Sequence, residues 1–190
     1  MLGEMDVVSP FGDVFLSLEL SEGYRFVLTC DDDPSDLDSH SFLSCGCHVS
    51  HRVMGCDVAG KRFELNRDDT NGFGPETTTW GGFVREGVYQ YWVHLYSGGI
   101  FVDTEVHVDI YGVDGLIDTR KIPEHGEGDI WWLVFEVNIE EDLQPSYTFP
   151  DTVQSEEPSI PIILGNSFRC DPYDHSFLQG IIGDSISSEK

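Results

Sequence analysis

Period-two patterning recurs along this 190-residue chain and constrains its fold more than any other feature. Because alternate side chains of a β-strand point to opposite faces, apolar residues at every second position predict half-buried strands and not helices. The pattern occurs in residues 14–20, 24–30, 89–95 and 102–110. Residues 130–138 are apolar on both faces, which is typical of a central strand.

The segments between these runs carry the residues that favour turns between strands. They contain the sequences Ser21-Glu22-Gly23, Gly81-Gly82, Ser97-Gly98-Gly99, Val113-Asp114-Gly115 and His125-Gly126-Glu127-Gly128. No convincing amphipathic helix precedes residue 139. Short strands with regular turn signals predict an all-β fold, an antiparallel, jelly-roll-like β-sandwich.

The character of the chain changes after Glu140. Residues 141–159 are rich in proline and acidic residues and predict an extended linker, and residues 160–164 and 177–182 form two short apolar patches. We therefore expect a β-sandwich binding domain over residues 1–140. Residues 141–190 would form a linker and an extended C-terminal tail that wraps the sandwich or docks on a neighbouring subunit.

Two dense packets of carboxylates, amides and hydroxyls lie at residues 33–40 and 65–77. Short oxygen-bearing side chains held by tight turns are what Ca²⁺ requires as ligands. If Asp36 and Asp38 lie in a strand, both carboxylates face one way and Leu37 anchors in the core. The alternative is that these residues serve only as turns and caps for the local backbone.

The charge of the chain limits its partners. Thirty-five acidic residues against ten basic ones give a formal net charge of −25, which argues against nucleic acid and anionic membrane surfaces. The chain has no apolar stretch long enough to predict a transmembrane helix, and its first residues do not predict a signal peptide. Membrane insertion is therefore not expected, and an intracellular location stays open beside a cell-surface one.

Five cysteines, at positions 30, 45, 47, 56 and 170, leave at least one thiol without an intrachain partner. A zinc site would draw on Cys45, Cys47, His48, His51 and Cys56. The Cys-x-Cys spacing departs from the usual zinc knuckle, so this site is not expected. A disulfide between Cys56 and either Cys45 or Cys47 is an alternative, as are reduced and packed cysteines.

Four ordered motifs carry a resemblance to a known family. They are PSDLDSH, LNRDDTNGFGPET, VYQYWVHLYSGG and KIPEHGEGDIWWLVFEV. Together, over roughly residues 24–138, they resemble the YfaP-like β-sandwich domains of unknown function, which also occur as ligand-binding modules in RTX-type calcium-dependent adhesins. The resemblance implies an all-β sandwich with a surface binding or adhesion role, in which calcium helps to shape the ligand face.

One departure from the family pattern weakens the implied metal site. The second motif usually reads Leu-Asp-x-Asp-Asp, whereas this chain has Asn66 and Arg67 before Asp68. Asn66 offers an oxygen without a charge, and Arg67 adds a cation nearby. The residues expected to hold Ca²⁺ are Asp36, Asp38, Asp68, Asp69 and Glu76.

The expected function is that of a non-catalytic, calcium-assisted adhesion module that recognises a peptide or a carbohydrate, at the cell surface as part of a larger chain. Its predicted ligand-binding residues are His40, Tyr91, His94, Tyr96 and Trp131. Such aromatic residues more often fill a core, and the adjacent Trp131 and Trp132 must point to opposite faces. The alternative is a structural subunit whose tail binds other copies of the chain. No catalytic motif is found, so an enzyme is not expected.

Overall fold

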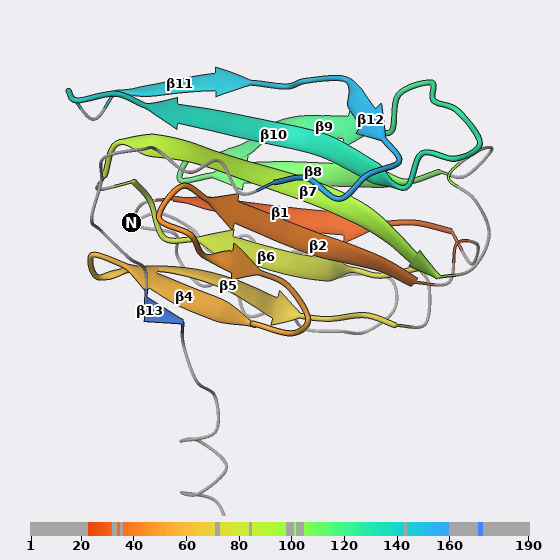
Figure 1. Cartoon of the computed structure of the whole chain (residues 1–190), viewed down its shortest axis with the longest axis horizontal. Helices are drawn as coiled ribbons and strands as arrows, with labels where there is room; N and C mark the ends of the chain where they lie inside the picture. Colours follow the sequence, from red (N-terminus) through yellow and green to blue (C-terminus); the bar gives the residue numbers. More distant parts are fainter. Residues whose placement is uncertain are drawn as a thin grey trace, which may run out of the picture.

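The computed structural model describes residues 23–31, 34, 36–70, 73–83, 85–97, 101, 105–142, 144–159 and 171–172. In this part of the chain thirteen strands and no helix are found. The strands form two antiparallel sheets that pack against each other in two layers (Figure 1). The prediction of an all-β antiparallel sandwich is confirmed.

The larger sheet contains seven of the described strands. In spatial order these are β13 (Asp171–Pro172), β4 (Gly55–Val58), β5 (Lys61–Arg67), β6 (Glu76–Trp80), β1 (Tyr24–Thr29), β8 (His107–Gly112) and β9 (Gly115–Lys121). This sheet supplies one wall of the core, and its strand β6 carries Glu76 to the candidate site.

The second sheet contains six of the described strands and carries most of the site. Its order is β11 (Pro145–Thr148), β10 (Trp131–Ile139), β7 (Gly87–Ser97), β2 (Asp36–Leu43) and β3 (His48–Val49), with β12 (Thr152–Gln154) also paired to β10. In Figure 1, β7 and β10 lie in front of the fainter strands β8 and β9 of the other sheet.

Alternation along the strands separates an inner core from an outer apolar cluster. Between the sheets, Phe26 stacks on Tyr91 with ring centroids 4.3 Å apart and meets Trp80 edge-on. On the outer face of the second sheet lies a separate buried cluster, formed by Phe42, Trp92, Trp131 and Leu133. Trp132 belongs to the inner core and Trp131 to the outer cluster, as the expected opposite orientation requires.

The structure departs from the sequence prediction after Glu140. Residues 145–148 and 152–154, which we assigned to a linker, form β11 and β12 and pair with β10. Pro145 is tolerated because it is the first residue of β11, which pairs with β10 alone among the described strands and is therefore an edge strand. The predicted strand at residues 14–20 and both apolar tail patches lie outside the described residues. In the part of the chain that the structure describes, no helix is suited to cross a membrane.

Candidate functional site

Strand β2 presents two residues of the first acidic packet, Asp38 and His40, on the outer face of the sheet. Residues 36–40 form part of this strand and not a loop, and Leu37 is buried in the inner core as expected. Asp38 and His40 share the opposite face because they lie two positions apart. Asp38 is directly opposite His94 of β7, which in turn is opposite Trp131 of β10. Three strands therefore bring these four side chains together.

Three carboxylates converge beside β2. One oxygen each of Asp38, Asp68 and Glu76 lies within 4.8 Å of the others, although the residues come from β2, a loop and β6. Asp38 and Glu76 are buried, and Asp68 is exposed. Among the described residues, no Lys or Arg forms an ion pair with any of the three. We call these residues the acidic group.

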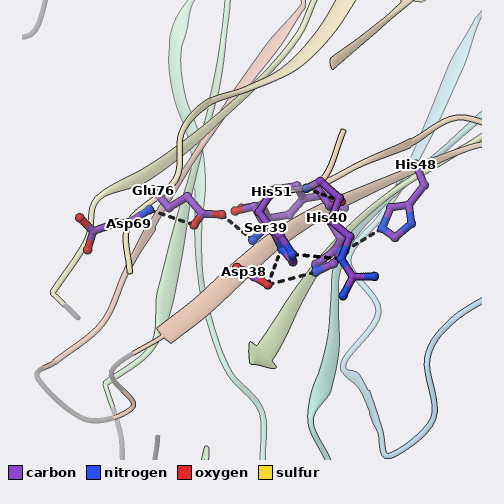
Figure 2. A network of polar contacts seen from close by, with 10 residues as sticks. Asp38, Ser39, His40, His48, His51, Asp69 and Glu76 are labelled. Atoms are coloured by element: carbon purple, nitrogen blue, oxygen red, sulfur yellow. Dashed lines mark hydrogen bonds and ion pairs between the residues drawn. The ribbon is translucent and has the colours of Figure 1, made fainter. Parts of the chain in front are cut away.

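Glu76 occupies an open edge of β2. One edge of β2 pairs with β7 along its length, and the other edge pairs with β3 only at Ser41 and Phe42. At residues 36–40 this second edge has no partner strand among the described residues. Glu76 Oε1 accepts a 2.5 Å hydrogen bond from the backbone N–H of Ser39, and Oε2 accepts a 3.4 Å one from Asp69 (Figure 2). Burial, followed by the charges of Asp38 and Asp68, raises the pKa of Glu76 from 4.5 to about 8 despite the hydrogen bond from Ser39.

The two remaining predicted metal ligands lie around the acidic group. Burial, followed by the charges of Asp38 and Asp68, raises the pKa of Asp36, and its Oδ1 is buried without a hydrogen-bond partner. Burial and Asp38 likewise raise the pKa of Asp68. Asp69 Oδ1 lies 3.4 Å from Arg67, while its Oδ2 is buried and unpartnered. Arg67 is thus paired with Asp69, and among the described residues no Lys or Arg is paired with the acidic group itself.

The loop that supplies Asp68 is held against β1 by a glycine. Gly74 has a positive φ of 74°, and a Cβ at this position would lie 2.7 Å from the carbonyl oxygen of Leu28. Only glycine tolerates both conditions without a shift of the backbone. The described residues at the end of this loop, Phe73 and Gly74, are therefore packed against the end of β1.

Imidazoles gather on the other side of Asp38. Its Oδ2 lies 3.0 Å from His51 Nδ1 and 3.9 Å from His40 Nε2, and His40 Nδ1 forms a 2.7 Å hydrogen bond with His48 Nε2 (Figure 2). His94 stacks on Trp131 with ring centroids 4.0 Å apart. Burial by itself would raise the pKa of Asp38, but these imidazoles hold it below its ordinary value. We call His40, His48, His51 and His94 the histidine group.

The histidine group borders a pocket of roughly 460 Å³. Its walls include Tyr96, Trp131, Arg52 and Glu157. Burial, followed by the charge of His40, lowers the pKa of both His48 and His94 to about 4. These two imidazoles are therefore neutral at pH 7. His94 keeps a lone pair that can bind a ligand, whereas Nε2 of His48 is hydrogen-bonded to His40.

Four of the five predicted ligand-binding residues line this pocket, namely His40, His94, Tyr96 and Trp131. Tyr91 does not, because it lies on the opposite face of β7, where it is fully buried and its hydroxyl is 2.7 Å from Ser39 Oγ. From sequence we grouped His48 and His51 with the cysteines and missed that His48 bonds to His40 and that His51 approaches Asp38. The spacing of β2 and β3 in the chain was the available signal, since a hairpin sets Phe42 opposite His48.

One residue of the pocket wall, Cys47, forms a disulfide bond. Cys47 is joined to Cys56, so neither thiol is free to bind zinc, and the buried Cys30 is a free cysteine. The bond closes the segment that carries His48 and His51.

We expect the double variant Cys47→Ser/Cys56→Ser to lose about 2–4 kcal/mol of unfolding free energy, since a disulfide restricts the unfolded chain. Urea unfolding without reductant measures this loss. An unchanged midpoint would mean that strand pairing alone holds residues 47–56.

The comparisons with known proteins support the fold of this chain and nothing further. No protein-family model and no curated protein matches the chain. A protein of unknown function, SAV2460, has a similar structure, with a TM-score of 0.57 and 14% identity over 72% of this chain and 92% of that one. A homologue of a telluride resistance protein (TerD), SCO6318 from Streptomyces coelicolor A3(2), gives a TM-score of 0.55 and 16% identity over 72% of this chain and 91% of that one. At these identities the likeness supports the sandwich fold, and the resemblance to YfaP-like domains stays a prediction.

Proposed function

We propose that this protein is a non-catalytic binding module in which Ca²⁺, held by Asp38, Asp68 and Glu76, orders the face that receives a peptide or carbohydrate ligand. The observation that carries the proposal is the convergence of three carboxylate oxygens within 4.8 Å. Glu76 is buried without a basic side chain beside it, which is costly for a carboxylate, and a hard divalent cation removes that cost by direct coordination.

The ligand set fits calcium in its chemistry. Ca²⁺ takes six to eight oxygen ligands from carboxylates, backbone carbonyls and water. The acidic group supplies carboxylates from three segments, and the unpartnered oxygen of Asp36 adds a further acceptor near Asp38 and Asp68. The loop after Arg67 brings Asp68 to β2, so a bound cation would tie this loop to the second sheet.

The neighbouring pocket supports a recognition role. Trp131 and Tyr96 offer aromatic surface, and the imidazoles and Arg52 offer polar contacts. Ligand pockets commonly combine apolar walls with a few placed polar groups. Asp38 belongs to the acidic group and also contacts His51 of the pocket, so a cation at the acidic group would help to fix the pocket floor.

The disulfide supports the expected cell-surface location, because such bonds persist mainly in oxidising compartments. The alternative of a self-assembling subunit depends on the tail, most of which lies outside the described residues. It stays a prediction.

The direct test is thermal unfolding of the chain in EDTA and during a calcium titration. A ligand that binds only the folded state stabilises it by RT ln(1 + [L]/Kd), which is about 2.7 kcal/mol at 100 times Kd. We expect a saturating rise in Tm for the natural chain and little or no rise for Asp68→Asn. Asp114→Asn, an exposed change in the turn between β8 and β9, is the matched control and should respond as the natural chain does. Equal responses of all three proteins would reject the proposed calcium ligands.

A further inference from the structure

We infer that the floor of the pocket is a second metal site, specific for Zn²⁺ or a similar transition-metal ion, with Asp38, His40 and His94 as its protein ligands. One ligand atom from each of these residues lies within 4.8 Å of the others. This site differs in chemistry from the acidic group, because imidazole nitrogen suits zinc whereas calcium takes oxygen. It does not depend on the proposed calcium function.

The strands hold the three ligands before any metal binds. Asp38 and His40 are two residues apart on one face of β2, and His94 is directly across from Asp38 on β7. The relative exposures of Asp38 and His40 are 4% and 5%, so both are fixed by packing. Stacking on Trp131 fixes the ring of His94. Sites built on paired strands keep their geometry better than sites on loops.

Buried polar atoms without partners point into this site. Asp38 Oδ2, His40 Nε2 and His51 Nδ1 are each buried and make no hydrogen bond of acceptable geometry among the described residues. Unsatisfied buried atoms are uncommon and costly in native proteins. Tetrahedral zinc with bonds of 2.0–2.1 Å holds its ligand atoms about 3.3 Å apart. The distance of 3.9 Å between two of the proposed ligand atoms, Asp38 Oδ2 and His40 Nε2, is about half an ångström longer than that spacing, so a bound ion would draw them slightly together.

The surrounding residues complete the arrangement expected of a zinc site. His48 Nε2 bonds to His40 Nδ1, so a proton on His40 Nδ1 leaves the lone pair of Nε2 for the metal. His51 approaches Asp38 from the rim of the pocket, where it orients the carboxylate. Three protein ligands leave the fourth position of the ion facing the pocket, as in zinc sites that bind an exchangeable ligand.

The test is calorimetric titration of the full chain with Zn²⁺ alone, after removal of metals and of any affinity tag. We expect one zinc ion per chain for the natural protein. His94→Phe keeps a ring beside Trp131 but removes the nitrogen, and His40→Gln removes the other imidazole. Each should weaken zinc binding at least tenfold, since even the residues that only orient zinc ligands contribute about 10–100-fold. The control is His107→Gln on β8 of the other sheet, which should leave binding unchanged.

The same titrations separate this site from the calcium site. Asp68→Asn should lose the calcium response and keep zinc, the histidine variants should lose zinc and keep the calcium response, and Asp38→Asn should weaken both. Absence of zinc binding in the natural chain, or zinc binding in both histidine variants as tight as in the natural chain, would overturn the zinc site whatever the calcium result. If a histidine variant fails to fold, Co²⁺ titration of the natural chain remains decisive. A visible spectrum of octahedral aqueous type would overturn the inference, and intense bands from tetrahedral nitrogen and oxygen ligation would support it.

Discussion

Replacing Trp80 by alanine is expected to lower the free energy of unfolding by about 3–5 kcal/mol, the usual loss when a buried tryptophan is truncated. Trp80 is fully buried on β6 and makes ring contacts with Tyr89 and Phe135 of the other sheet. Its Nε1 also donates a 2.8 Å hydrogen bond to Ser41 Oγ on β2. The variant therefore loses contacts on both sides of the core, in a domain of a class whose total stability is about 5–15 kcal/mol.

Two milder variants separate packing from hydrogen bonding at this position. Ser41→Ala removes the acceptor and leaves the indole N–H unsatisfied, which costs about 1–3 kcal/mol. Trp80→Phe keeps an aromatic ring and removes the N–H, so its loss should lie between those of the other two variants. Urea unfolding with an unchanged m-value measures all three. A loss in Trp80→Ala no larger than that in Ser41→Ala would contradict the role of Trp80 in joining the sheets.

The layers of the sandwich could be predicted from sequence because alternation records burial directly. Residues 24–30 and 130–138 are found in β1 and β10, and Trp131 and Trp132 separate to opposite faces. The same alternation assigns Tyr91 to the face opposite His94, so its inclusion among ligand-binding residues disregarded the period of its own strand. The strands at residues 145–154 were missed since local composition, rich in proline and acid, does not report the pairing with β10.

The carboxylates of the candidate site could be predicted from sequence, but the contacts that place them beside β2 and the histidines could not. From the short oxygen-bearing residues in two packets we predicted five ligands for one cation, and the structure brings three of them, Asp38, Asp68 and Glu76, together. Local sequence does not predict that Glu76 accepts a hydrogen bond from Ser39 at the edge of β2, because the two residues are 37 positions apart in the chain. The approach of His51 to Asp38 likewise depends on the turn after β3 and on the disulfide.

The last prediction concerns the pH dependence of stability when no metal is present. The pKa of Glu76 is raised by burial from 4.5 to about 8 in the folded chain. A group with a raised folded pKa favours folding fully below its unfolded pKa, and this contribution is lost as pH rises through its folded pKa. In EDTA, ionisation of Glu76 should therefore cost the natural chain stability as the pH rises from about 4.5 to about 8. His48 and His94, whose pKa values are lowered from 6.5 to about 4, act in the opposite direction and add stability as the pH rises from about 4 to 6.5.

Glu76→Gln should remove this loss, because the amide is uncharged at every pH and its oxygen can still accept the Ser39 N–H. Each pKa unit corresponds to about 1.4 kcal/mol, so near pH 8 in EDTA the variant should be the more stable protein by a few kcal/mol. With saturating calcium the order should reverse, since the variant lacks a carboxylate for the cation. Urea unfolding from pH 4 to pH 9, with and without calcium, measures both differences.

Exposed Glu140 provides the control, and Glu140→Gln should follow the natural chain at every pH. Comparison of paired variants also cancels the contributions of Asp36 and Asp68, whose raised pKa values act in the same direction. Parallel curves for the natural chain and Glu76→Gln in EDTA would mean that Glu76 ionises in the folded chain without cost. The acidic group would then not need a cation, and the strongest physical reason for placing calcium there would be lost. If Glu76→Gln is more stable than the natural chain in EDTA and less stable in saturating calcium, then Glu76 destabilises the folded chain without the cation and stabilises it with the cation bound.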